Sequence, residues 1–329
     1  VEKTDAGTTV AFTNKLSPDT THGKLNVKIN PYIKIDKMLP ERLKRNKDIG
    51  IQEVSKLDED AFVKQVSDAV AASPHNSLLV MVFGYKDDFE ATAIKAAYFS
   101  YLLDVNTPVL LFDWPGDQSV TPWGYKDAQG LAIESGPRLG ELLTTIIRKV
   151  GPKNLWIEAS SLGSQVVCDA FDYMYQHADL ADADQEIAHV ILAAPDVGRD
   201  EFKTNFKDKL VALSKKLTTY VSSDDNALLM SGFLNRGPRL GRISFTEPEQ
   251  LEETKELLYV QSLLPDQVAV IDVTPVNNSS FKHGYYLESP DFYDDFYTRI
   301  MGKEPNVSRR LYLIKCKDNV DFWVMRGDK

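Results

Sequence analysis

Residues 156–171 read WIEASSLGSQVVCDAF. The first residues have the apolar bias of a buried strand, and those after Gly163 have the spacing of apolar residues that is typical of a helix. Ser161 lies in the short turn between them. A sharp strand-to-helix turn needs small residues two before and two after the serine, and Ala159 and Gly163 meet that need. Two roles fit Ser161 at this point, a nucleophile held above a sheet or the N-cap of the helix.

Buried strands and amphipathic helices alternate along most of the chain. Continuous apolar runs predict strands at 77–83, 108–113, 155–158, 187–194, 217–222 and 268–273. Apolar residues at helical spacing predict helices at 58–70, 89–103, 131–149 and 205–216, with another after the turn that holds Ser161. This alternation predicts an α/β fold with a mostly parallel sheet flanked by helices.

Three parts of the chain differ in pattern. Residues 1–57 combine short alternating runs with a basic stretch at 40–47, which predicts a strand-containing N-terminal lead-in packed on the main domain. Residues 58–303 form the predicted α/β domain. Residues 304–329 contain two alternating runs around a polar turn, which predicts a C-terminal β-hairpin. The hairpin either extends the sheet or pairs with the N-terminal strands.

The composition is that of a globular protein. Of the 329 residues, 43% are hydrophobic and 26% are charged, and the net charge is −10. This acidic balance argues against a nucleic-acid partner or an anionic membrane surface, since both need a basic patch. No apolar run approaches the roughly 18 residues that a membrane-spanning helix needs, so we expect a soluble protein without a transmembrane segment. Because the chain starts at Val1 and not at Met, an exported form with a processed leader stays open, as do the compartment and the oligomeric state.

Neither a metal site nor a bound cofactor is expected. The two cysteines, Cys168 and Cys316, are far apart, and Cys168 falls on the apolar face of a predicted helix, which is typical of a core position. Aspartates and histidines do not occur at the spacing of metal ligands. Gly136 and Gly140 lack the Lys-Ser/Thr pair of a phosphate-binding loop.

A serine nucleophile needs a base whose pKa is near 7, which indicates a histidine. His283 lies in a loop after the strand at 268–273, and ligands of a parallel sheet gather at the carboxyl ends of its strands. The other four histidines lie in the lead-in, in a turn, after a helix and at the far end of a strand: His22, His75, His177 and His189. His283 is therefore the predicted base.

The base needs a carboxylate that holds its ring in one tautomer. Asp224 and Asp225 both follow the strand at 217–222, and the residues alone favour neither. Asp196 follows an earlier strand, where we expect it to line the site or to cap a helix. The resulting chain order of Ser, Asp and His is that of α/β-hydrolases, which makes the α/β-hydrolase fold the prediction.

Two backbone amides are predicted to form an oxyanion hole. The Leu162 amide follows the nucleophile directly, and the Tyr85 amide follows Gly84 at the end of the first buried strand. A glycine at that point lets the backbone approach the serine closely.

Four stretches resemble an α/β-hydrolase family of bacterial esterase-like proteins that has long been catalogued as a domain of unknown function. They are VMVFGYKDDF (80–89), VLLFDWP (109–115), ILAAPDV (191–197) and YVSSDDNAL (220–228). The resemblance covers about residues 78–290. It implies that Asp225, the second aspartate of the last stretch, is the acid, and that His283 in the sequence HGYY matches the histidine of the family.

Two positions depart from the pattern of that family. Phe83 and Ser160 stand where the family usually has histidine, before the glycine of the first motif and before the nucleophile. With Ser161, Asp225 and His283 in place, the sequence predicts a serine hydrolase that acts on a small-molecule carboxylic ester through an acyl-enzyme. The missing histidines favour the alternative, a non-catalytic binding or scaffold protein on a hydrolase frame. A peptidase of the same fold is a third reading that the sequence does not separate from the first.

Several further residues are candidates for the walls of the site. A pocket is expected from four of them: Phe83, Trp114, Ser160 and Asp196. The turn-rich segment 117–130 is a candidate lid or rim. The insertion 229–258 carries three arginines, either on a surface loop or as a site for an anionic substrate group: Arg236, Arg239 and Arg242.

Overall fold

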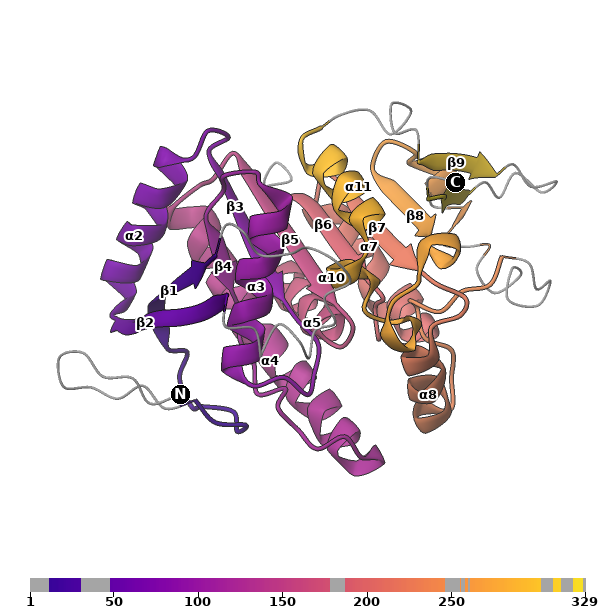
Figure 1. The fold of residues 1–329 in the computed structure, drawn as a ribbon, viewed down its shortest axis with the longest axis horizontal. Helices are drawn as coiled ribbons and strands as arrows, with labels where there is room; N and C mark the ends of the chain where they lie inside the picture. The colour runs from indigo at the N-terminus through magenta and orange to yellow at the C-terminus, as the bar shows by residue number, and fades with distance from the viewer. Residues whose placement is uncertain are drawn as a thin grey trace.

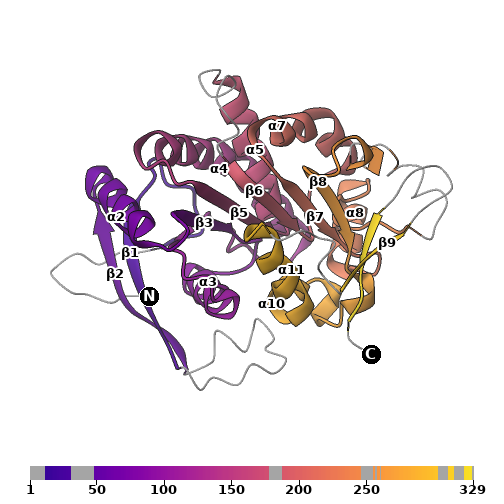
Figure 2. The same cartoon turned by 90° about the horizontal axis from the view of Figure 1, so that it is seen from above.

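The computed structural model describes residues 12–30, 48–177, 187–245, 255, 258–259, 261–302, 310–314 and 322–327. Eight strands form one twisted sheet with helices on both faces (Figure 1). Figure 2 shows α4, α5 and α7 on one face of this sheet and α3, α10 and α11 on the other. The predicted α/β architecture is therefore confirmed.

The order of the strands across the main sheet differs from their order along the chain, because β3 lies between β4 and β5. Across the sheet they are β4 (Val109–Leu111), β3 (Ser77–Val82), β5 (Asn154–Ser160), β6 (Ile187–Ala193), β7 (Leu217–Val221), β8 (Val268–Asp272), β10 (Phe322–Met325) and β9 (Leu311–Ile314). All neighbours from β4 to β10 pair in parallel, and β9 pairs antiparallel with β10. The C-terminal pair thus extends the main sheet beside β8 and does not join the N-terminal strands.

Helices connect the parallel strands and cover the sheet. They are α2 (Glu59–Ala72), α3 (Phe89–Leu103), α4 (Pro122–Lys149), α5 (Gly163–Gln176), α6 (Arg199–Glu201), α7 (Lys207–Leu213), α8 (Asn226–Asn235), α10 (Tyr285–Glu288) and α11 (Pro290–Ile300). A π-helical turn, η2 (Phe202–Phe206), joins α6 to α7, and two short 3₁₀ turns, η3 (Thr274–Val276) and η4 (Ser280–Lys282), follow β8. Within the described residues, no helix combines the length and the apolar composition needed to cross a bilayer.

Helix α4 begins earlier than its apolar spacing predicts. The Thr121 hydroxyl accepts a hydrogen bond from the Gly124 amide at 3.0 Å, and Pro122 occupies the first helical position, where its missing N–H costs nothing. The helix predicted at 131–149 therefore starts at Pro122, inside the turn-rich segment 117–130. Tyr125 in this first turn of the helix is buried, which indicates that packing fixes its conformation.

The N-terminal strands form a second, smaller sheet. β1 (His22–Ile29) and β2 (Ile49–Leu57) pair antiparallel, and Ile49 packs with Ile94 and Tyr98 of α3 in a buried cluster. The basic stretch 40–47, most of the alternating run 9–12, Cys316 and the turn of the C-terminal hairpin lie outside the described residues.

Strand β5 shows why the central strands read as continuous apolar runs. Leu155 and Ile157 pack in one core with α4 and α5, whereas Trp156 packs on the opposite face in the core that includes α3 and α11. Because both faces are covered, alternate residues have no solvent-facing side. Cys168 of α5 is fully buried with a free thiol, which confirms its prediction as a core residue.

Candidate active site

Ser161 occupies a strained turn at the carboxyl end of β5. Its φ is 52°, in the left-handed region that residues other than glycine seldom adopt. The Ser161 amide donates to Ala193 O and the Ser161 carbonyl accepts from the Asp196 amide, each at 3.0 Å, so that the turn is fixed to the end of β6. Strain that is held in place in this way is typical of a nucleophile elbow.

Ser161 does not cap the helix that follows it. Helix α5 begins at Gly163, its N-cap is Leu162, and no side chain makes a capping hydrogen bond there. The N-cap role, which the sequence left open, is therefore not the role of Ser161. The serine is 8% exposed, so its side chain is close to the surface of the site without extending into solvent.

Two glycines allow backbone segments to meet around Ser161. A Cβ atom at Gly163 would lie 2.2 Å from Val82 O, so only glycine fits where α5 begins beneath β3. A Cβ atom at Gly84 would lie 2.8 Å from Ser161 Cβ, 3.1 Å from Ser161 Oγ and 3.5 Å from the Leu162 nitrogen. The loop after β3 therefore passes directly against the serine hydroxyl and the following amide.

The amides predicted for an oxyanion hole lie on these same segments. Tyr85 follows Gly84, and Leu162 follows Ser161. In the part of the chain that the structure describes, neither amide donates a hydrogen bond to a protein acceptor. Both N–H groups are thus available to a ligand oxygen.

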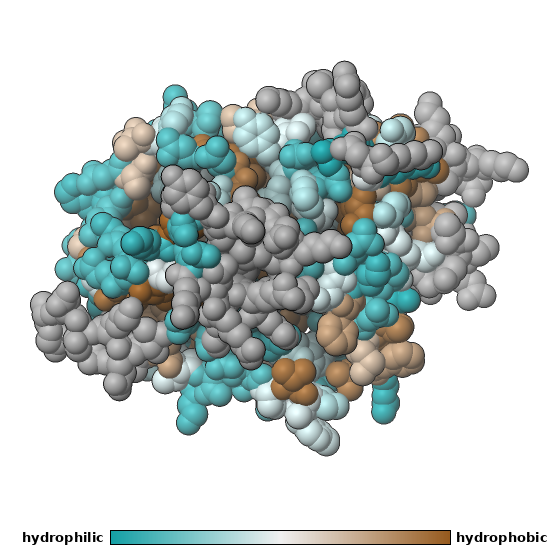
Figure 3. Space-filling model, viewed as in Figure 1, coloured by the Kyte–Doolittle hydropathy of each residue, from teal (hydrophilic) through white to brown (hydrophobic). Residues whose placement is uncertain are grey.

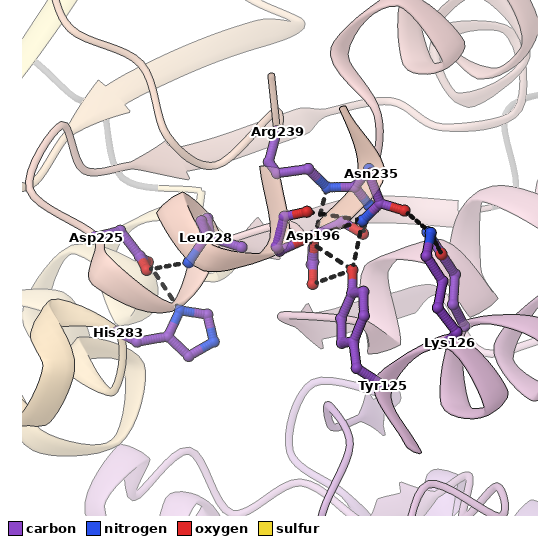
Figure 4. Close-up of polar contacts among 10 residues, drawn as sticks. Tyr125, Lys126, Asp196, Asp225, Leu228, Asn235, Arg239 and His283 are labelled. Atoms are coloured by element: carbon purple, nitrogen blue, oxygen red, sulfur yellow. Dashed lines mark hydrogen bonds and ion pairs between the residues drawn. The ribbon is translucent and has the colours of Figure 1, made fainter. Parts of the chain in front are cut away.

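Asp225 and His283 form a hydrogen-bonded pair at the same edge of the sheet. Nδ1 of His283 lies 2.8 Å from Oδ2 of Asp225. The other oxygen of Asp225 accepts the Leu228 amide at 2.8 Å, because Asp225 is the N-cap of α8 (Figure 4). The carboxylate is fully buried, whereas the His283 side chain is 18% exposed. β5, β7 and β8 are parallel, so Ser161, Asp225 and His283 all follow strand ends on one side of the sheet.

The surroundings of His283 favour its protonated form. Burial alone lowers the pKa of an imidazole, but the charge and the hydrogen bond of Asp225 outweigh burial and raise the pKa of His283 above its ordinary value. Asp196 contributes in the same direction, and Lys86 opposes it.

Asp224 and the remaining histidines have other contacts. Asp224 accepts the Ser222 hydroxyl at 2.6 Å and lies 3.8 Å from Lys282 Nζ. Of the histidines in the described ranges, His283 alone is paired with a carboxylate. Three others contact aromatic or neutral polar groups: His22 packs on Phe62, His177 bonds to Tyr173 O, and His189 bonds to the Thr218 hydroxyl.

Asp196 is part of a buried network beside the elbow. Its Oδ1 lies 2.6 Å from Arg239 Nε, and both side chains are 4% exposed. Tyr125 of α4 donates its hydroxyl to Oδ2 of Asp196 at 3.0 Å (Figure 4). Ser231 of α8 donates to Oδ1 of the same carboxylate at 2.6 Å. Arg239 was expected on a surface loop or at an anion site; both expectations are wrong, because its charge is buried against Asp196.

The four residues expected in a pocket have different environments. Phe83 and Ser160 are buried, and Phe83 packs in the core on the α3 side of the sheet. Trp114 donates its ring N–H to Phe83 O at 2.8 Å and lines a cavity of about 240 Å³. That cavity is bounded by residues 12–14, 87–90, 113–115 and Asp117, so it lies beside the loop that follows β3.

Two buried polar residues near the site, Asn277 and Glu158, were not predicted from the sequence. Asn277 donates to Lys282 O at 2.6 Å and to the Ser222 hydroxyl at 2.9 Å, which ties the histidine loop to the end of β7. Both carboxylate oxygens of Glu158 are buried without a hydrogen-bond partner, and burial raises the pKa of Glu158 well above its ordinary value. A carboxyl group inside a strand that is otherwise apolar was the available signal for Glu158. For Asn277 the signal was a small polar side chain a few residues before the histidine.

No metal centre is found in the part of the chain that is described, since no group of three or more His, Cys, Asp or Glu side chains is placed to hold an ion.

Comparisons with known proteins give one relative and several structures of low similarity. An uncharacterized protein of Nostoc sp., alr1448, is 24% identical over 233 residues, which make up 60% of this chain and 60% of the relative. An uncharacterized protein from Bacillus cereus shares 16% identity at a TM-score of 0.39, covering 71% of this chain and 61% of that chain. LpqC, a poly(3-hydroxybutyrate) depolymerase from Bordetella parapertussis, shares 15% identity at a TM-score of 0.37, covering 70% of this chain and 83% of that chain.

A family model gives the clearest result. The model described as an alpha/beta hydrolase of unknown function, DUF900, matches residues 58–303, which is most of the chain. The match includes every strand of the main sheet except β9 and β10, and it includes Ser161, Asp225 and His283. It confirms the resemblance seen in the sequence, and the chain belongs to this family of alpha/beta hydrolases of unknown function.

Proposed function

We propose that the protein is a serine hydrolase that cleaves a carboxylic ester through an acyl-enzyme on Ser161. The observation that carries this proposal is the 2.8 Å pair of His283 and Asp225, at the sheet edge where Ser161 lies in a strained elbow. Membership of an alpha/beta hydrolase family supports the hydrolytic reaction.

In the first half of the reaction, Ser161 Oγ attacks the ester carbonyl carbon. Nε2 of His283 takes the proton from the hydroxyl, and the negative charge that forms on the carbonyl oxygen is stabilised by the Tyr85 and Leu162 amides. The tetrahedral intermediate then expels the alcohol, which receives the proton from His283. The acyl group stays bound to Ser161 as an ester.

In the second half, water takes the place of the alcohol. His283 removes a proton from the water as it attacks the acyl-enzyme, and the same two amides stabilise the second oxyanion. Collapse of this intermediate breaks the bond to Ser161 Oγ, which recovers its proton from His283. The carboxylic acid leaves and the free enzyme is restored.

Asp225 fits the role of the orienting acid. Its Oδ2 accepts from Nδ1 of His283, which leaves Nε2 as the unprotonated nitrogen that can act as a base. Because its Oδ1 is held by the Leu228 amide, the carboxylate cannot rotate away from the ring. A carboxylate that is fully buried also interacts more strongly with the imidazolium that forms during the reaction.

Turnover of p-nitrophenyl acetate, butyrate and octanoate tests the proposal. The wild-type protein should hydrolyse at least one of these esters, and Ser161→Ala should reduce turnover to the background rate. Ser164→Ala is the matched control, because Ser164 lies three residues on and is buried, and within the described residues its hydroxyl makes a single hydrogen bond, of 3.4 Å, to Ala159 O. A folded wild-type protein that turns over no ester would support the non-catalytic alternative.

A further inference from the structure

Two consecutive residues before His283 have strained backbones. Phe281 and Lys282 have φ values of 53° and 56°, in the left-handed region that favours glycine. An aromatic residue there costs folding free energy, and such conformations persist where the surrounding structure imposes them.

Packing of Phe281 does not offset this strain. The side chain is 78% exposed, and its ring contacts no other aromatic ring among the residues that the structure describes. An exposed phenylalanine contributes little hydrophobic stabilisation, since most of its apolar surface stays in water. The fold therefore bears the cost of the strain without a gain in stability from this side chain.

Buried hydrogen bonds fix the loop in this conformation. Asn277, which is 1% exposed, donates to Lys282 O at 2.6 Å and to the Ser222 hydroxyl at 2.9 Å. It also accepts the Ser279 hydroxyl at 2.7 Å, so both ends of the strained turn are attached to one side chain. The Phe281 ring is thus presented from a rigid loop.

Phe281 belongs to the same loop as the proposed base. Phe281 lies two residues before His283, and η4 packs against α8, the helix that Asp225 caps. Helix α8 exposes two more large apolar side chains, Met230 at 62% and Phe233 at 74%. Figure 3 shows apolar surface over α8 on this side of the molecule.

We propose that Phe281 determines specificity by contacting the alcohol group of the ester, and that the site selects esters of apolar alcohols. This inference rests on the proposed function. In that reaction His283 hands its proton to the leaving alcohol, so the alcohol occupies the histidine side of Ser161. Phe281 belongs to the histidine loop and is the exposed apolar side chain nearest to His283 in the sequence. The acyl group, which stays on Ser161 after the alcohol has left, lies away from this contact.

The test compares two acetate esters, 1-naphthyl acetate and ethyl acetate, with wild-type protein and Phe281→Gly. The variant should lower kcat/KM for the naphthyl ester about tenfold, which is typical of one lost apolar contact, and should leave the ethyl ester nearly unchanged. Because glycine adopts a positive φ freely, the same variant should unfold at a higher temperature than the wild type.

Lys282→Gly is the matched control, because it relieves strain of the same kind and keeps the Phe281 ring. It should raise the unfolding temperature and leave the ratio of the two kcat/KM values unchanged. If Phe281→Gly has the same ratio of the two kcat/KM values as the wild type, the inference is overturned and the proposed function still stands. A wild-type protein that cleaves neither ester and does not react at Ser161 would overturn both.

Discussion

The two oxygens of Asp225 are divided between His283 and the first turn of α8. Oδ2 lies 2.8 Å from Nδ1 of His283, and Oδ1 accepts the Leu228 amide at 2.8 Å. The carboxylate that orients the proposed base is therefore itself oriented by a helix N-terminus, whose positive dipole end favours its ionised form. Asp224, its neighbour in sequence, lies 3.8 Å from Lys282 Nζ and takes no part in this arrangement.

Asp225→Asn should lower kcat about 10³- to 10⁴-fold, because an amide cannot hold the histidine in the tautomer that leaves Nε2 free. The fold should be kept, since the amide oxygen still caps α8. Ester turnover and circular dichroism measure the two effects. Asp224→Asn is the control and should retain turnover within a few-fold of the wild type; equal losses in the two variants would contradict the assignment of Asp225.

The pH dependence of kcat/KM should reflect the raised pKa of His283. A protonated imidazole cannot accept the Ser161 proton, so activity is lost as the pH falls through that pKa. Because Asp225 outweighs burial, the midpoint of this loss should lie above the ordinary histidine value of about 6.5. Lys86 opposes the shift, so Lys86→Gln should move the midpoint to higher pH. A midpoint below that ordinary value, or a downward shift in Lys86→Gln, would be inconsistent with this electrostatic picture.

Gly84→Ala should lower kcat about 10²-fold with little change in KM. The added methyl would lie 2.8 Å from Ser161 Cβ, so the loop must move and carry the Tyr85 amide away from the oxyanion. Steady-state kinetics measure the two constants. Gly130→Ala is the control, because a Cβ there meets nothing within 4 Å, and it should leave kcat unchanged. Wild-type kcat in Gly84→Ala would remove Tyr85 from the proposed oxyanion hole.

Glu158→Gln should raise the free energy of unfolding, and the gain over the wild type should grow as the pH rises. In the folded protein burial raises the pKa of Glu158 well above its ordinary value, whereas in the unfolded chain Glu158 loses its proton near the ordinary glutamate value of about 4.3. Above that pH the unfolded state binds fewer protons than the folded state, so the wild type loses stability as pH increases towards the raised pKa. Glutamine has nearly the same shape and does not titrate. Urea unfolding of both proteins from pH 5 to 8 should give curves that diverge; parallel curves would show that Glu158 is ionised in the folded state.

The sequence was most informative where one local requirement determines the structure. A continuous apolar run such as Ser77–Val82 is stable as a strand that is covered on both faces, and in the structure it forms β3, in which every residue is buried. The elbow around Ser161 was recognisable because steric crowding allows only small neighbours. The prediction was less accurate at the start of α4, where Thr121 and Pro122 begin a helix whose first turns carry turn-forming residues.

Local sequence patterns could not predict the contacts between residues that are far apart in the sequence. Asp224 and Asp225 are equivalent in the local pattern, and only the position of His283, 58 residues after Asp225, distinguishes them. Arg239 was expected on a surface loop because it lies in an insertion that carries three arginines, yet its partner Asp196 lies 43 residues earlier. Buried ion pairs of this kind depend on the path of the chain between the partners, which no short window of sequence contains.

Labelling with a fluorophosphonate probe tests most directly whether Ser161 is an activated nucleophile. The probe phosphonylates a serine hydroxyl that a neighbouring base has activated, and peptide mass mapping then locates the adduct. We predict one adduct per chain, on the peptide that contains Ser161, with no labelling of Ser161→Ala and slower labelling of Asp225→Asn. A folded wild-type protein that stays unlabelled, or that carries its adduct on another residue, would contradict the account.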